Sequence, residues 1–257
     1  MSQKLSLDEK EKLYQDVLPI AIEYRRTFID EMVPIKDSFS TLEQLGFLIL
    51  RFPALQENKS LAGFTIYKRP YHCIYINSRQ NLGRQYLSCW HECYHAISGE
   101  GNGLSYISSD DEDSIEYKAN VFAGIILMPD NLVKNYMDIH NFSVEYLKYT
   151  QIIKMQNYFR VSYSAMLTRL IQLYPEAEFS LKKRYAICKN TVEAKRNLIK
   201  KTKEIQGDLR LIQPTNDIYI PQTLFENIEF NMKEKRITKE KAYELLKLID
   251  GLADDSR

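Results

Sequence analysis

Apolar side chains recur every three or four residues along most of this chain, the spacing of helices that bury one face. Over residues 6–37 the pattern predicts one or two helices, with Pro19 and Pro34 as interruptions. Further helices are expected over about 84–98, 114–128, 130–175, 222–234 and 239–251.

Residues between the first and second of these helical stretches follow a different pattern. Residues 46–52, 63–68 and 71–77 are short runs rich in Phe, Ile and Tyr, which predict strands. The turn Lys68-Arg69-Pro70 makes a hairpin of the last two. Another short strand is expected at 218–220, in a linker over about 206–222. The order of elements therefore predicts an α+β fold with a small sheet before the central helix.

Polar residues and glycines mark the expected ends of the helices. Ser40 or Thr41 is expected to start a short helical turn, and Gly99 to end the helix over about 84–98. Pro129 stands where the following helix must stop. The other predicted caps are Asp130, Ser143, Ser162 and Thr238 at N-termini and Gly251 at a C-terminus.

The pattern H-E-x-x-H occupies residues 91–95, inside the central helix. His91 and His95 are four residues apart and lie on one helix face, so both imidazoles can bind one zinc ion. Glu92 can accept a proton from a zinc-bound water instead of binding the metal. The alternative is a surface helix that happens to carry two histidines.

A third protein ligand is expected, because a catalytic zinc usually has three. Glu116 lies in the first turn of the next predicted helix, and two antiparallel helices can bring it to the histidines. It can instead be a first-turn acid favoured by the helix dipole. Asn120, one turn later, can hydrogen-bond a ligating side chain. The competing ligands are loop carboxylates, namely Asp110, Asp111 and Asp113.

Cysteines offer another set of ligands. The chain has four, none in a C-x-x-C pair, and we interpret them as small buried hydrophobes of a reducing compartment: Cys73, Cys89, Cys93 and Cys188. A competing zinc site would use Cys73 together with the H-E-x-x-H pattern. His72 is interpreted as an ordinary surface or strand histidine rather than a fourth ligand.

Composition is that of a globular protein, with 44% hydrophobic and 27% charged residues among 257. That length is enough for a sizeable core and one or two domains. The net charge of +1 gives no global electrostatic argument for nucleic acid. The charged N-terminus predicts no signal peptide, and no apolar run approaches the roughly 18 residues of a membrane span. A cytoplasmic protein is expected.

Two stretches together resemble a known family, the ImmA/IrrE family of bacterial metallopeptidases. They are HECYH at 91–95 and IEYKANVFAGIILMP at 115–129. The family pattern is H-E-x-x-H, then E-x-x-A-N-x-F-A, then a hydrophobic pair and M-P. The upstream strands are similar too, so the resemblance covers about residues 15–175.

This resemblance implies a zincin-like fold and a zinc metallo-endopeptidase of a bacterium or a mobile element. It implies that His91, His95 and Glu116 bind Zn²⁺ and that Glu92 is the general base. A common substrate in the family is a helix-turn-helix (XRE-like) repressor, cleaved to induce genes. Such a repressor is therefore the expected partner.

Two features raise the question of DNA binding. Residues 152–170 resemble a helix-turn-helix, with a break at Val161-Ser162. Packing of the two helices on the core is favoured, because Arg169 is the only cation placed for base contacts. Residues 181–204 carry nine Lys and Arg against two Glu, a balance of 9 − 2 = +7. That stretch suits a nucleic-acid or acidic-partner surface, but a solvated helical face is favoured.

The sequence thus predicts two parts. Residues 1–175 form a zincin-like metallopeptidase domain, with a helix-turn-helix-like part at about 130–175, and residues 176–257 form a helical extension. Tyr71–Asn77 is the expected edge strand beside the metal, where an extended substrate can pair. The best interpretation is a zinc-dependent endopeptidase that cleaves a repressor. The alternative is a non-catalytic regulator, or a toxin–antitoxin partner, that binds a repressor or DNA.

Overall fold

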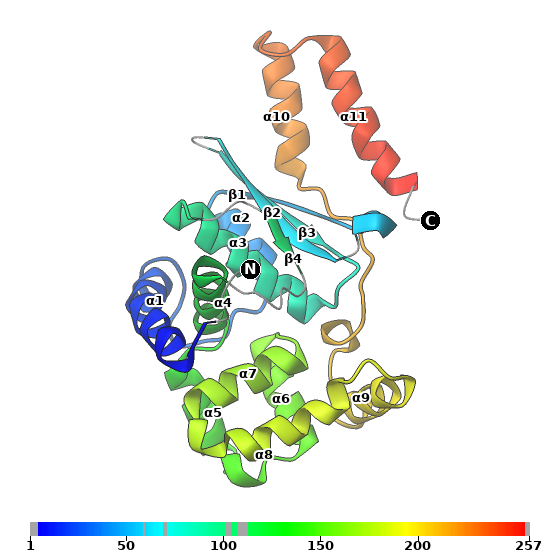
Figure 1. The fold of residues 1–257 in the computed structure, drawn as a ribbon. Coiled ribbons are helices and arrows are strands. Elements are labelled where there is room, and N and C mark those ends of the chain that lie inside the picture. Colours follow the sequence, from blue (N-terminus) through cyan, green and yellow to red (C-terminus); the bar gives the residue numbers. More distant parts are fainter. Residues whose placement is uncertain (1–4, 59, 69–70, 101–103, 107–112, 255–257) are drawn as a thin grey trace.

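The chain folds into a small sheet with helices on one face, followed by a helical region and a projecting pair of helices (Figure 1). The computed structural model describes residues 5–58, 60–68, 71–100, 104–106 and 113–254. Mixed α+β structure confirms the predicted fold class. Among the described helices, none is long and apolar enough to cross a membrane.

The sheet contains four strands in the order β1-β3-β2-β4. They are β1 (Phe47–Phe52), β2 (Leu61–Lys68), β3 (Tyr71–Asn77) and β4 (Leu104–Tyr106). β3 pairs with β1 in parallel and with β2 in antiparallel fashion, and β2 pairs antiparallel with β4. The three strands predicted near 46–77 are confirmed, but the prediction that Tyr71–Asn77 is the edge strand is wrong. It lies in the interior of the sheet because β1, earlier in sequence, pairs with its other side.

A distant segment covers the outer side of β1. Arg51 and Tyr219 exchange two backbone hydrogen bonds of 2.9 and 2.6 Å, and Arg51 also forms an ion pair with Asp217. Residue Tyr219 forms only an isolated bridge, so the strand predicted at 218–220 is reduced to one paired residue. The strand order makes β1 and the short β4 the two edges of the sheet, and this contact pairs one residue of β1.

Three long helices form the layer beneath the sheet: α1 (Leu7–Phe28), α3 (Leu82–Ser98) and α4 (Ser114–Leu127). Helix α3 contacts the sheet and α4, and α4 packs against α1. Their apolar faces meet around Tyr24, whose ring lies 5.6 Å from Phe122 and 6.4 Å from Trp90. Trp90 and Phe122 are fully buried, so α3 is held from both sides.

Several helix ends differ from the predicted ones. Helix α1 runs through Pro19 and ends at Phe28. Helix α2 (Ser38–Gln44) begins earlier than expected, because the Asp37 side chain caps it at the backbone N–H of Phe39 and Ser40. Strand β4 lies between the two central helices, where the sequence pattern predicted no strand.

The remaining helices form a lower group (Figure 1) and an arm. The lower group contains α5 (Asp130–Ile139), α6 (Tyr149–Phe159), α7 (Tyr163–Leu173), α8 (Glu178–Lys182) and α9 (Val192–Glu204). Ser162 caps α7 as predicted. Pro129 rather than Asp130 is the N-cap of α5, and Ser143 precedes only a 3-10 turn over Val144–Tyr146. Further 3-10 turns are Gln56–Asn58, Pro175–Ala177, Lys183–Cys188 and Leu209–Leu211.

Helices α6 and α7 form the pair that resembles a helix-turn-helix. Arg169 of α7 is 1% exposed. Its guanidinium donates to the Met128 carbonyl at 2.9 Å and forms an ion pair with Asp130. A buried cation with these partners has no access to a base edge, so Arg169 joins α7 to the end of α4. Its observed role is structural.

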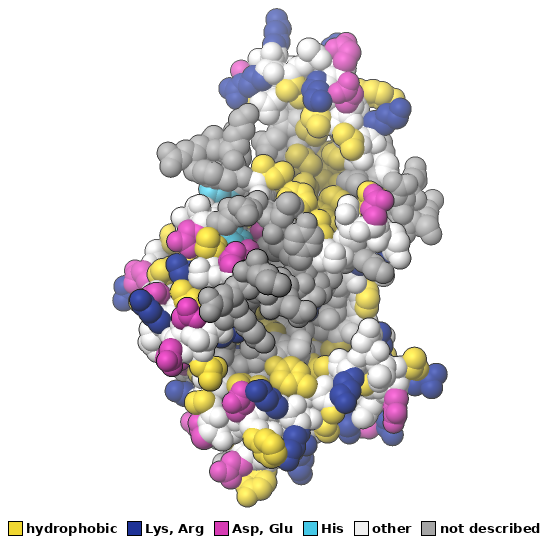
Figure 2. Space-filling model, viewed as in Figure 1, with side chains coloured by type: hydrophobic (Ala, Val, Ile, Leu, Met, Phe, Trp, Pro, Cys, Tyr) yellow, Lys and Arg dark blue, Asp and Glu magenta, His cyan; other side chains and the backbone are white. Residues whose placement is uncertain are grey.

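The arm consists of α10 (Gln222–Lys233) and α11 (Lys239–Asp254), which project beyond the sheet (Figure 1). Thr238 accepts from the backbone N–H of Lys241, which confirms the predicted cap. Gly251 does not end α11, which continues to Asp254. Figure 2 shows hydrophobic side chains gathered where the arm leaves the sheet and both basic and acidic side chains near its tip.

A close backbone contact joins α3 to the turn between α6 and α7. A Cβ atom on Gly83 would lie 2.3 Å from the Val161 carbonyl carbon and 2.3 Å from the Ser162 nitrogen. These are backbone atoms that cannot rotate away. Only glycine therefore allows α3 to approach the backbone of the α6–α7 turn this closely. The contact fixes α3 against the lower helices.

Gly83→Ala should therefore lower the free energy of unfolding by about 2–3 kcal/mol, the usual cost of overpacking. The matched control is Gly124→Ala in α4, where a Cβ would meet nothing within 4 Å. That change should stabilise the helix by about 0.5–1 kcal/mol. Thermal and denaturant unfolding measure both, and equal stability of the two variants would contradict the packing described.

Candidate metal centre

Helix α3 places His91 and His95 on one buried face. They are 6% and 4% exposed, and their rings lie 4.8 Å apart. The helix has well-formed ends on both sides of this pair. Asn81 caps the N-terminus by accepting from Arg84, and Gly99 adopts a left-handed φ of 70° at the C-terminus. This conformation suits glycine, because other residues adopt it at a cost.

Hydrogen bonds on the far side of each ring determine where the imidazole protons lie. His91 Nδ1 is 3.0 Å from the Asn120 side-chain oxygen, and His95 Nδ1 is 2.8 Å from the Glu100 carbonyl oxygen. Both oxygens are acceptors, so both Nδ1 atoms donate. The Nε2 atoms then direct lone pairs toward each other across 3.0 Å. Two facing lone pairs repel, and a cation between them removes the repulsion.

Glu116 completes the cluster from α4. Its carboxylate oxygens lie 3.1 Å from His91 Nε2 and 3.3 Å from His95 Nε2. Asp113 caps the first turn of α4 by accepting from the Ile115 and Glu116 backbone N–H groups. Burial raises the pKa of Glu116. Protonated at Nε2, the two histidines outweigh burial through hydrogen bonds and charge and lower this pKa to about 2. Glu116 is therefore an anion at neutral pH.

The carboxylate also affects His95. Burial lowers the pKa of His95, but hydrogen bonds with Glu116 and with the Glu100 carbonyl, and the charges of Glu92 and Glu116, raise it overall. A proton therefore competes with a metal for His95 Nε2. Because a ligating histidine must be neutral, acid should weaken metal binding at this cluster.

Glu92 lies next to the first histidine and is fully buried. Strand β2 packs over it, since a Cβ on Gly63 would lie 3.5 Å from Glu92 Cγ. The absence of a side chain at Gly63 thus leaves room between the sheet and the carboxylate.

Those competing ligands from the sequence that lie in the described residues do not join this cluster. Within the described residues, His91, His95 and Glu116 form the group whose possible ligand atoms all lie within 4.8 Å of one another. Asp113 acts as a helix cap, and Asp110 and Asp111 lie outside the described residues.

The His72 ring lies 5.3 Å from Phe47, in the strand environment predicted for it. The cysteines are free thiols, and burial raises the pKa of Cys73 to about 11 and of Cys93 to about 12.

One important contact of the cluster has no signal in the sequence. The acceptor for His95 is the main-chain oxygen of Glu100, which any residue type supplies. Its position depends on the left-handed turn at Gly99. Tyr94 reinforces this turn because its hydroxyl lies 3.2 Å from the Glu100 carboxylate. Asn120, by contrast, was recognisable from its spacing to Glu116.

Two buried imidazoles and one half-buried carboxylate thus form a group that could hold a metal ion, on a helix pair beneath the small sheet of a zincin-like fold. The chain belongs to the Peptidase_M78 family, described as the IrrE N-terminal-like domain, whose sequence profile matches residues 42–170. The match extends from α2 into α7. It contains His91, Glu92, His95 and Glu116. It supports a metallopeptidase. A search of curated proteins gives no match.

Asn120 should influence metal affinity through its hydrogen bond to His91, although it is not itself a proposed ligand. Asn120→Ala removes the acceptor for His91 Nδ1 and should weaken metal binding by about 10- to 100-fold, the usual effect of losing such a partner. Asn120→Asp keeps an oxygen in place and is the matched control, which should bind at least as tightly as the wild type. Competition with a chromophoric chelator measures both. Unchanged affinity in Asn120→Ala would contradict the assigned hydrogen bond.

Proposed function

We propose that this protein is a zinc-dependent endopeptidase in which Glu92 is the general base. The proposal rests on the possible ligand atoms of His91, His95 and Glu116, which all lie within 4.8 Å of one another. The neighbouring Glu92 is fully buried. Two imidazole nitrogens and one carboxylate are a ligand set that zinc favours, with a position left for water or substrate. His91, His95 and Glu116 would hold the ion.

Zinc bound there would polarise the scissile carbonyl and lower the pKa of a water molecule. Glu92 accepts the proton of the attacking water and passes it to the leaving amine nitrogen. The buried position of Glu92 favours this role, because a carboxylate shielded from solvent interacts strongly with a nearby proton. Asn120 and the Glu100 carbonyl hold the two rings in place, so the base and the ligands keep a fixed geometry.

Glu92→Gln should separate catalysis from folding and metal binding. The amide keeps the shape of the side chain but cannot accept a proton, so peptide cleavage should fall by roughly 10²-fold or more. Zinc content should stay at the wild-type level. The matched control is Glu57→Gln, at an exposed carboxylate in the turn before β2, which should cleave at close to the wild-type rate. Wild-type cleavage by Glu92→Gln would exclude the proposed base.

The proposed substrate is a helix-turn-helix (XRE-like) repressor, the substrate class that the ImmA/IrrE resemblance implies. An extended segment of such a protein can pair with the edge strand of the sheet, which orients its backbone beside the metal. Since the Tyr219 segment covers β1, we place this pairing at β4. Strand β4 has three residues, so pairing there would engage only a short extended segment of the substrate.

We further propose that the arm docks the partner. Its helices carry exposed apolar side chains far from the core, with Phe230 51%, Tyr243 68% and Leu248 66% exposed. The segment before the arm is different: Leu211 is fully buried, and Thr215 bonds the Gln85 side chain of α3 at 2.8 Å. A truncation that tests docking should therefore begin at residue 222 and keep this segment.

The full-length chain should cut a cognate repressor at one or a few sites and cut casein poorly. Deleting residues 222–257 should slow repressor cleavage by about tenfold or more, because docking contacts supply the discrimination, and should leave zinc content unchanged. Mass spectrometry maps the products, and elemental analysis gives the metal. Rapid, scattered cleavage of casein by the full-length chain would exclude a restricted substrate range.

A further inference from the structure

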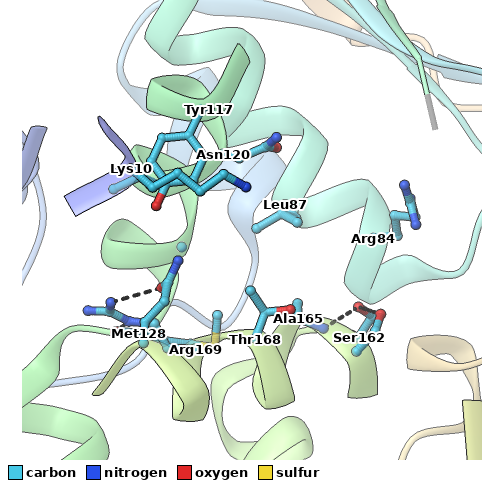
Figure 3. Close-up of a pocket in the computed structure, with 14 residues that line it drawn as sticks. Lys10, Arg84, Leu87, Tyr117, Asn120, Met128, Ser162, Ala165, Thr168 and Arg169 are labelled. Atoms are coloured by element: carbon cyan, nitrogen blue, oxygen red, sulfur yellow. Dashed lines mark hydrogen bonds between the residues drawn. The ribbon is translucent and has the colours of Figure 1, made fainter. Parts of the chain in front are cut away.

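The two imidazoles of the metal cluster are oriented by acceptors of different kinds. His91 Nδ1 lies 3.0 Å from the Asn120 side-chain oxygen, and Asn120 points from α4 toward α3 (Figure 3). His95 Nδ1 lies 2.8 Å from the main-chain oxygen of Glu100. Glu100 lies two residues beyond the end of α3, outside any helix or strand. The orientation of His95 therefore depends on the contacts that hold Glu100.

Side chains of both helices hold Glu100. Its backbone N–H donates to Ser98 Oγ at 3.1 Å. Its carboxylate oxygen Oε2 accepts from the Tyr94 hydroxyl at 3.2 Å and forms an ion pair with the Lys118 ammonium group at 3.5 Å. Ser98 and Tyr94 belong to α3, whereas Lys118 belongs to α4. These contacts fix the Glu100 backbone, and with it the carbonyl that accepts from His95.

Lys118 differs from Tyr94 in the helix that carries it. Tyr94 is next to His95 on α3, so both move together if this helix shifts. Lys118 lies on α4, two residues after Glu116. The ion pair therefore joins the acceptor of His95 to the helix that supplies the carboxylate of the cluster. The Lys118 and Glu100 side chains are 24% and 40% exposed, and a partly shielded charge pair keeps its geometry better than a fully exposed one.

We propose that Lys118 is a positioning residue of the metal centre. Through the Glu100 carboxylate it holds the main-chain oxygen that keeps His95 Nε2 directed at the ion. Helix α4 thus orients both imidazoles, His91 directly through Asn120 and His95 indirectly through Lys118. This inference rests on the proposed function, because the ion it concerns is the proposed zinc.

The alternative is an ordinary ion pair near the surface. Such a pair adds slightly to stability and affects neither imidazole in particular. A positioning role instead predicts unequal effects on the two rings, because Glu100 contacts His95 whereas Asn120 contacts His91. The His91 ring is therefore an internal control for the His95 ring.

Zinc affinity is the first measurement, by competition with a chromophoric chelator. Lys118→Met keeps an apolar stem and removes the ammonium group, and it should weaken zinc binding by about three- to tenfold. This loss is smaller than that expected for Asn120→Ala, because Lys118 acts through a further residue. Lys118→Arg should restore an affinity close to that of the wild type. The matched control is Lys134→Met, at an exposed lysine of α5, which should bind zinc as the wild type does.

Exchange of the ring protons separates positioning from general loosening. In the zinc-loaded protein each ligating histidine retains one proton on Nδ1, and proton NMR in D₂O measures its exchange with solvent. Lys118→Met should speed exchange of the His95 proton by about tenfold and leave that of His91 unchanged, because local opening exposes only the ring whose acceptor has moved. Asn120→Ala should do the reverse, which assigns the two signals.

A second variant removes the same contact from the other side. Glu100→Gln removes the negative charge and should weaken zinc binding about as much as Lys118→Met, and the double variant should bind no more weakly than either single one. Thermal unfolding shows whether each variant is folded. Wild-type zinc affinity in both single variants, or equal acceleration of exchange in the two rings, would overturn the positioning role alone. Absence of zinc binding by the wild type would refute the proposed function, and this inference with it.

Discussion

Two imidazole nitrogens that face each other at 3.0 Å are the constraint on which this structure depends. Each ring is held from behind by an acceptor, so neither can turn away. For the rings to lie this close, α3 must be buried along one side, pack against α4 and end at Gly99. The packing around Trp90 and Phe122, and the close contact at Gly83, supply these conditions. This packing of the core therefore fixes the positions of four side chains, those of His91, Glu92, His95 and Glu116.

Features that depend on local spacing were predictable from the sequence. The H-E-x-x-H pattern identified the helix and its histidines, because a four-residue spacing fixes a common face. Glu116 and Asn120 are also four residues apart, and the structure places both at the histidines. The strands near 46–77 followed from their apolar residues.

Features that depend on long-range pairing were not predictable. The edge of the sheet was misassigned, since β1 pairs in parallel with β3 and Tyr219 reaches β1 from the far end of the chain. Packing of α6 and α7 on the core was expected, but the burial of Arg169 through Asp130 and the Met128 carbonyl had no signal in the sequence. Such partners are set by tertiary packing rather than by neighbouring residues. The division at about residue 175 stays a prediction, although the chain near 209–219 returns to the sheet.

The zinc content of the purified protein tests the central claim most directly. Elemental analysis of the wild type should give about one zinc per chain, and His95→Ala and Glu116→Ala should each lose most of it, because three protein ligands hold a catalytic zinc. Glu57→Ala, at an exposed carboxylate in the turn before β2, is the control and should keep its zinc. Full zinc content in Glu116→Ala would contradict the ligand set, and absence of zinc from the wild type would contradict the account of the site.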